Sequence, residues 1–370
     1  MIKRIISVLI LITCASVVFA DGNFRYSLLQ SFMYDSNIYE TSKDLKSSGI
    51  SSTQLFLDYL SKIPNSSLSL GISANTGYNA FTEDSAKNNY CNAGLNLALS
   101  NEYFKLKNRF VYTSEQANNS LSERSERIGN EFVFNARTSN KKMFAAGIIA
   151  SDEYNRYIKE EDKALNRNRV NGGLQFFYNI SSKTSIFVED IISSIIYENN
   201  DINNSLENSV SLGIEGNITP KVKGDIKLSY DNRQYEKTGI DNASIFGYEV
   251  KLFYEPNNVT SITVLGDRKI EETIYGQNRY YISTGGNLLL NRQITQRFDA
   301  EVLFSYENMY YPYGAEKRED NFYRVSPSLN YQFMERWFVT LWYQFKNRKS
   351  NISEMDYSDN VVGLNVKFTF

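Results

Sequence analysis

Strict alternation of apolar and polar residues runs through this chain almost from end to end, and it constrains the fold more than any other feature. The last segment shows it most clearly, with Val362, Leu364, Val366, Phe368 and Phe370 on one face and Gly363, Asn365, Lys367 and Thr369 on the other. Successive side chains of a β-strand point to opposite faces, so each segment of this kind is expected to be a strand. The pattern predicts an all-β chain.

Short turn signals divide the alternating segments into pairs. They recur 36 to 42 residues apart, near Asn65, Asn101, Asn140, Ser182, Pro220, Asn257, Ile294 and Glu335. Each interval contains one strand, a longer polar stretch and a second strand, which predicts hairpins joined alternately by short turns and longer loops. We count about 18 strands, with 16 as the alternative. The strand around Ile186–Tyr197 alternates poorly and is expected to carry a β-bulge.

The length of the segments favours a membrane-spanning sheet over a secreted sandwich. The runs reach ~9–12 residues, as in tilted membrane strands, whereas strands of soluble sheets average ~5–6. In lipid every backbone polar group must be paired internally, so the sheet must close into an antiparallel barrel. Lipid outside and water inside then require one apolar and one polar face, which reconciles 14% aromatic residues with 22% charged residues.

Aromatic residues near the ends of the segments are expected to form two girdles at the membrane surfaces. The candidates for one rim are Tyr78, Tyr112, Tyr230, Tyr280, Tyr306, Tyr310, Tyr311 and Tyr323. Those for the other rim are Phe104, Tyr178, Tyr254, Phe333, Trp337, Phe368 and Phe370.

Residues 1–20 have the features of a cleaved secretory signal. Lys3 and Arg4 precede a short apolar run, and Val18-Phe19-Ala20 forms a cleavage site before Asp21. The run is shorter than the ~20 residues that a membrane-spanning helix needs. Cys14 offers a lipoprotein alternative, although the residues before it fit a lipobox poorly. We therefore expect a signal at 1–20 and a barrel at 21–370.

The composition argues against catalysis and metal binding. The chain has no histidine and only two cysteines, which removes the usual general base, the commonest metal ligand and any disulfide framework. Neighbouring carboxylates such as Asp299 and Glu301 are expected by chance among 42 acidic residues. We expect no enzyme, no cofactor and no metal. Basic and acidic residues nearly balance in number, and the sequence shows no basic patch of the kind that binds nucleic acid.

The alternation also predicts which charged side chains face the interior. The pore-lining candidates are Lys105, Lys107, Arg109, Asp299, Glu301, Glu307, Arg324 and Lys367. The strand with Lys105, Lys107 and Arg109 should lie almost opposite the strand with Asp299, Glu301 and Glu307. Facing basic and acidic rows would create a transverse field that orients polar solutes. The alternative is local pairing between neighbouring strands, as around Lys223-Asp225-Lys227.

The two ends of the chain resemble known barrels. The closing strand, which ends in an aromatic residue, resembles those of bacterial outer-membrane β-barrels. This resemblance implies that Val366, Phe368 and Phe370 form the signal read by the barrel assembly machinery. The segment Phe32–Tyr39, with Tyr-Asp-Ser-Asn-Ile at its centre, resembles the opening strand of the putative β-barrel porin type 2 family. An even strand number would place both termini and the short turns in the periplasm, and the longer loops outside the cell.

The resemblance implies a bacterial outer-membrane location in contact with outer-membrane lipid. We expect a porin-like channel for passive diffusion of small polar solutes. The alternatives are a barrel for export or assembly of polysaccharide or surface protein, and a non-conducting structural surface barrel. A homotrimer is plausible because many porins trimerise, but the sequence identifies no interface, and it names no solute.

Overall fold

The computed structural model describes residues 23–63, 66–116, 124–138, 142–237, 241–273, 279–313 and 317–370. The predicted signal at 1–20 and the turn signals at Asn65 and Asn140 lie outside the described residues. The predicted signal and its boundary with the barrel therefore stay predictions.

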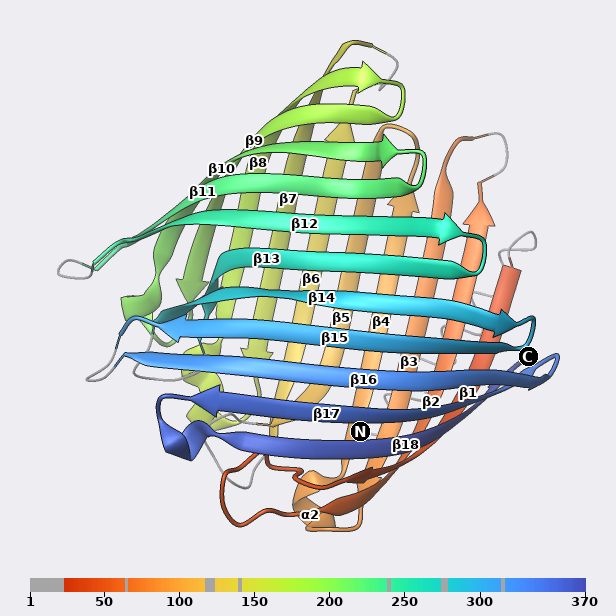
Figure 1. The fold of residues 1–370 in the computed structure, drawn as a ribbon. Helices are drawn as coiled ribbons and strands as arrows, with labels where there is room; N and C mark the ends of the chain where they lie inside the picture. Colours follow the sequence, from red (N-terminus) through yellow and green to blue (C-terminus); the bar gives the residue numbers. More distant parts are fainter. Residues whose placement is uncertain are drawn as a thin grey trace.

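Eighteen antiparallel strands form one closed sheet in which each strand pairs with its neighbours in sequence (Figure 1). Pairing of β18 with β1, from Ser27/Thr369 to Asp35/Val361, closes the barrel. The prediction of a closed barrel with 18 strands, and not 16, is confirmed. The strands are β1 (Asn23–Asp35), β2 (Ser48–Lys62), β3 (Ser69–Phe81), β4 (Tyr90–Ser100), β5 (Phe104–Gln116), β6 (Arg124–Arg137), β7 (Phe144–Tyr157), β8 (Arg167–Ser181), β9 (Thr184–Tyr197), β10 (Ser205–Thr219), β11 (Val222–Tyr235), β12 (Ala243–Asn257), β13 (Thr260–Glu272), β14 (Tyr280–Thr295), β15 (Phe298–Tyr311), β16 (Arg318–Met334), β17 (Trp337–Ser350) and β18 (Tyr357–Thr369).

Short turns and longer connections alternate along the chain as predicted. The short turns, such as 182–183 and 220–221, gather at one end, which we call the short-turn end and which also holds Asn23 and Phe370. The longer connections, of which 36–47 is the longest, define the long-loop end. In the described part of the chain, four of them contain short helical turns: α2 (Ser85–Asn88), η1 (Glu160–Leu165), η2 (Asp201–Asn203) and η3 (Ser353–Met355). No helix among the described residues is long and apolar enough to cross a membrane.

The strands are longer than the apolar runs suggested, from 11 residues in β4 to 17 in β16. The difference arises because alternation is visible only where one face meets lipid. β16, for example, begins with Arg318-Glu319-Asp320, where both faces are polar but pairing with β15 already continues. The long-loop connections are correspondingly shorter than expected.

The bulge expected in β9 is wrong. β9 pairs with β10 without a register shift from Thr184 to Ile195. Its alternation is poor because apolar Phe187 and Ile195 face inward and polar Asp190 faces outward. The register shifts occur instead beside short turns, for example between Asn217 and Thr219.

The outer face carries the apolar stripe and most of the predicted girdle residues. The ring centroids of Tyr306 and Tyr323 lie 5.1 Å apart near the long-loop end. Those of Trp337 and Phe368 lie 4.6 Å apart at the short-turn end. Two of the predicted girdle positions are wrong. Tyr311 is on the inner face because it pairs with Arg318, and Tyr280 is buried in a cluster described below.

Candidate functional site: the barrel lumen

Cross-strand register places all eight predicted pore-lining residues on the inner face. Directly paired residues share a face, so the register can be followed from strand to strand. Lys346 pairs with both Asp359 and Arg324, and Arg324 pairs with Ser305. Residues an even number of positions apart on one strand also share a face. These pairings therefore place Arg324 on the same face as Lys367 of β18 and as Asp299, Glu301 and Glu307 of β15. The same argument links Lys105, Lys107 and Arg109 to Asn96 and Asn135. Their role in lining a conducting path stays a prediction.

The two charged rows lie on opposite walls. β5 is on the far wall and β15 on the near wall in Figure 1. Both strands begin at the short-turn end, which brings Lys105 and Lys107 to a depth similar to that of Asp299 and Glu301. The acidic row is held by neutral donors: Asn330 Nδ2 donates to Asp299 at 2.8 Å, and Ser283 Oγ donates to Glu307 at 2.6 Å.

The basic row forms no ion pair within 4.0 Å among the described residues, although Glu131 of β6 lies directly opposite Arg109. Among the described residues, no carboxylate oxygen lies within 4.0 Å of the charged groups of Lys105, Lys107 or Arg109. Arg25, Lys62 and Lys367, near the short-turn end of β1, β2 and β18, also form no ion pair within 4.0 Å among the described residues, although Asp58 lies directly opposite Arg25. We call these six residues the basic arc.

Local pairing dominates on the wall formed by β9–β13. Lys227 Nζ lies 3.3 Å from Glu189 and 3.1 Å from Glu249. Lys269 Nζ lies 3.1 Å from Asp267 and 2.8 Å from Glu271. The alternative of local pairing therefore describes this wall, whereas the six residues of the basic arc form no ion pair within 4.0 Å in the part of the chain that the structure describes.

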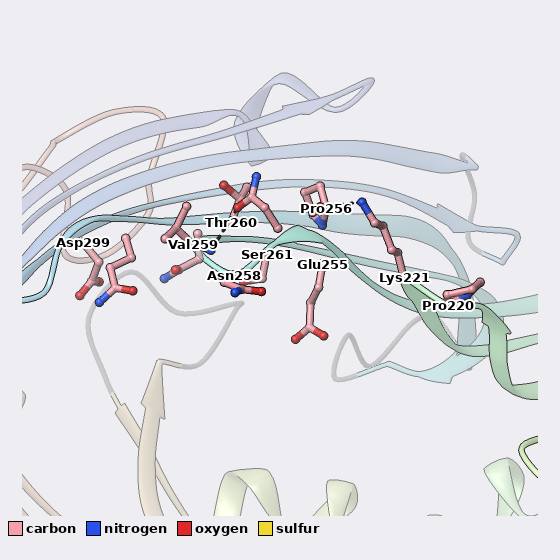
Figure 2. Close-up of a pocket in the computed structure, with 12 residues that line it drawn as sticks. Pro220, Lys221, Glu255, Pro256, Asn258, Val259, Thr260, Ser261 and Asp299 are labelled. Carbon is pink, nitrogen blue, oxygen red and sulfur yellow. Dashed lines mark hydrogen bonds between the residues drawn. The ribbon is translucent and has the colours of Figure 1, made fainter.

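Three hollows lined by described residues follow the β7–β15 side of the lumen, and the smallest of them, of about 430 Å³, lies beside the turn at 182–183. One, of about 750 Å³, lies at the short-turn end and is lined mainly by polar groups (Figure 2). Figure 2 shows the side chains of Glu255 and Asp299 projecting from neighbouring parts of this wall. Lys221 is held back by a 2.9 Å bond from its Nζ to the carbonyl oxygen of Pro256. The third hollow, of about 690 Å³, lies deeper and is lined by ion-paired residues that include Arg169, Glu207 and Lys227.

A buried ionic network fills the long-loop side of the deeper hollow. Arg233 is 0% exposed and donates to Glu207 at 2.6 and 2.8 Å and to Glu272 at 2.6 Å. Arg169 donates to Glu207 at 2.8 Å, and the hydroxyl of Tyr197 donates to Glu272. Burial of these charges is tolerable because each ion has an opposite partner.

An apolar cluster lies next to this network and narrows the lumen. It joins Tyr235, Ala243 and Ile245 with Ile270 and Tyr280. The first three are on the inner face of β11 and β12. The other two have the parity of the lipid-facing positions of β13 and β14, as does Glu272. The long-loop ends of β13 and β14 are therefore tucked against the inside of the neighbouring wall.

The connection at 36–47 also folds inward. Asn37, Ile38 and Thr41 are buried, and Lys346 Nζ bonds to Glu40 at 2.9 Å and lies 3.2 Å from Asp359. Outside the membrane-spanning part, Lys46 bonds to Glu83 of the next long connection at 3.1 Å, which raises the pKa of Lys46. The long-loop half, which we call the packed half, thus holds the ionic network, the apolar cluster and this connection, whereas the buried cluster of the short-turn half joins Ala145, Phe177 and Phe187.

Sequence reasoning did not single out this packed half. Alternation alone would have placed Glu207, Arg233 and Asp359 on the inner face. No sequence signal marks Glu272, because its parity is that of a lipid-facing position. Among the described residues, no group of three or more potential ligands is arranged to hold a metal ion.

A family described as "Putative beta-barrel porin 2" matches residues 23–370. Solved structures with the same fold include OpdL of Pseudomonas aeruginosa, with 11% identity, a TM-score of 0.52, and coverage of 95% of this chain and 99% of that one. The outer membrane protein OpdK of P. aeruginosa has 10% identity, a TM-score of 0.51, and coverage of 94% and 99%. OccAB4 of Acinetobacter baumannii has 12% identity, a TM-score of 0.50, and coverage of 95% and 99%. Comparison with curated proteins finds no match. At such identities the structural likeness shows the fold alone.

Proposed function

The chain belongs to the putative beta-barrel porin 2 family and is a bacterial outer-membrane barrel, and on this premise we propose that it is a porin-like channel for passive diffusion of small polar solutes. The proposal assigns it no catalysis. The observation that carries the proposal is the basic arc, since unpaired lysines and arginines on an inner wall are stable only where water reaches them. An 18-stranded barrel is wide enough to hold that water.

The charge layout supports a channel with weak overall ionic preference. Lys105, Lys107 and Arg109 of the basic arc lie on one wall, and Asp299 and Glu301 lie on the opposite one. A solute that crosses between them experiences a field across the pore, which favours dipolar solutes over strongly anionic or cationic ones.

Single-channel recording in planar bilayers tests the proposal. We expect stable open steps, and we expect the combined change Lys105→Glu, Lys107→Glu and Arg109→Glu to shift ion selectivity toward cations. A matched control changes the same number of charges outside the lumen: Lys87→Glu, Lys163→Glu and Lys349→Glu. Equal selectivity of the two triple variants would refute the role of the basic row. Migration in SDS that does not change on boiling would argue against a stable barrel.

One observation favours a second candidate, a non-conducting surface barrel: the packed long-loop half of the lumen. Persistent electrical silence of correctly folded protein would support this candidate, or the export role, over the channel. The proposal also includes assembly by the barrel assembly machinery through Val366, Phe368 and Phe370, and a homotrimer as the assembled state.

A further inference from the structure

The wall of the barrel is open on one side of the packed half. β12 and β13 pair from Asn257/Thr260 to Tyr248/Arg268, and within the described residues their pairing ends there. Ala243–Gly247 continues to pair with β11, and Lys269–Glu272 continues to pair with β14. We call this unpaired stretch the seam. Figure 1 shows the end of β13 bending away from β12 at this point.

The bent end is held inside by contacts to the inner wall. Ile270 and Tyr280 pack in the cluster with Tyr235 and Ile245. Glu272 accepts bonds from Arg233 and Tyr197. These contacts define the tucked position of the β13 and β14 ends.

The alternation of the same residues suits a different position. Continuing the register of the β12–β13 pair beyond Tyr248/Arg268 would place Ile270 opposite Phe246. Both would then face lipid. Phe246 now stands 79% exposed at the edge of the seam. Lys269 and Glu271 would remain on the inner, wet face. We call this the zipped position.

The geometry points to a gate at this seam, which would regulate the channel proposed above and rests on that proposal. In the tucked position the ends of β13 and β14 occupy part of the lumen. In the zipped position they complete the wall and leave the lumen wider.

The two positions stabilise different groups, as a two-state element requires, and zipping gives up the ion pair between Arg233 and Glu272. Tucking buries apolar side chains and forms the Arg233–Glu272 ion pair. Zipping pairs the backbone edges of β12 and β13, which a lipid environment favours strongly. It also places Ile270 against Phe246 in the apolar outer face.

Two engineered cysteine pairs that have position 270 in common distinguish the tucked from the zipped position. Neighbouring residues of β12 point to opposite faces, so Ile270→Cys can form a disulfide with Phe246→Cys only when zipped and with Ile245→Cys only when tucked. Both pairs are made with the native Cys91 replaced by serine. The pair Val210→Cys and Tyr230→Cys, which is directly opposed on the outer face of β10 and β11, is the matched control.

We expect both test pairs to form disulfides in the folded barrel under mild oxidation. The zipped disulfide should raise the single-channel conductance above that of the tucked disulfide, and reduction should abolish the difference. Failure of the zipped pair to cross-link while the control pair does, or equal conductance of the two locked forms, would overturn the gate. Silence of every variant despite formation of both disulfides would instead overturn the channel, because cross-linking reports the two positions without conduction.

A point variant gives an independent reading. Glu272→Gln weakens the bond to Arg233, and we expect it to raise the ratio of zipped to tucked disulfide by about tenfold. Glu271→Gln, on the inner face of the same strand and paired with Lys269, is the matched control and should leave that ratio unchanged. The same ratio in both variants would contradict the role of Glu272 in holding the end of β13 in the tucked position.

Discussion

Two kinds of charged residue share the inner face of this barrel, and burial separates them. Arg233 is completely buried between Glu207 and Glu272, whereas Lys105 and Lys107 have no carboxylate oxygen of a described residue within 4.0 Å. A buried ion relies on its partners because the surrounding medium cannot screen it. A charged side chain without an ionic partner is instead stabilised by hydration.

This difference makes Arg233 the most sensitive single position of the packed half. We expect Arg233→Met to lower the free energy of unfolding by about 3–5 kcal/mol, because two carboxylates lose their shared cation. Urea unfolding in lipid vesicles, followed by tryptophan fluorescence, measures the change. Arg324→Met is the control, since among the described residues Arg324 donates to Ser305 alone, on a less buried part of the wall. Equal loss in the two variants would show that the network adds no more stability than a single inner hydrogen bond.

The side to which the eight pore-lining candidates point was predictable, but the depth of burial of the charges on the inner face was not. Alternation assigned Lys105 and Lys367 to the interior because the side-chain period of a strand is two, and no bulge intervenes to reverse it. The pairing of Arg233 depends on Glu272, which arrives from a strand that leaves the wall. A local pattern contains no information on such a contact.

At the level of the strands, β10 and β11 depend on two facing glycines beside their short turn. Gly216 and Gly224 pair with each other and have φ values of 113° and 148°. A Cβ atom on Gly216 would lie 1.9 Å from the carbonyl oxygen of Lys183, and one on Gly224 would lie 1.8 Å from that of Lys251. The backbone therefore has no room for a side chain at either position.

We expect Gly216→Ala to destabilise the barrel by about 1–3 kcal/mol or more, because strain in φ adds to the steric clash. Gly172→Ala is the matched control on the same sheet, since nothing lies within 4 Å of a Cβ at that position. The temperature at which the folded form disappears from SDS gels measures both. The prediction fails if Gly216→Ala shifts that temperature no more than Gly172→Ala.

Phe370, which follows the last strand, contributes to closure of the barrel and belongs to the proposed assembly signal. The amide of Phe370 donates to the carbonyl of Tyr26 at 2.9 Å, where β18 meets β1 and closes the barrel. The ring centroids of Phe370 and Phe368 lie 4.5 Å apart. We expect Phe370→Ala to reduce the amount of folded barrel in the outer membrane several-fold, while the protein that does assemble keeps its conductance. Quantification of heat-modifiable protein in membrane fractions measures this effect. Tyr331→Ala, an exposed aromatic on the outer face of β16, is the control. Unchanged assembly of Phe370→Ala would remove this residue from the proposed assembly signal.

For the molecule as a whole, the number of strands was predictable because a barrel repeats one local unit. Each hairpin can be recognised from its own alternation and turn, and the need to pair every backbone group in lipid forces the set to close. The tuck of β13 and β14 could not be predicted in this way. Ile270 and Tyr280 have the pattern of an ordinary lipid-facing stripe, and only the contacts of the complete barrel show that they are buried in the inner cluster.

Charge on opposite walls gives the final prediction, which concerns the pore as a unit. The influence of fixed charges reaches ~10 Å in 0.1 M salt but only ~3 Å in 1 M salt. The basic arc should therefore act on passing ions across much of the lumen at low salt and only at its surface at high salt. We expect the difference in ion selectivity between the native barrel and the Lys105→Glu, Lys107→Glu, Arg109→Glu variant to be large in 0.1 M KCl and to shrink strongly in 1 M KCl. Reversal potentials under a KCl gradient at the two mean concentrations measure it. A difference that does not depend on salt would mean that these side chains touch the permeating ions at a constriction, rather than act through a field across a wide, water-filled pore.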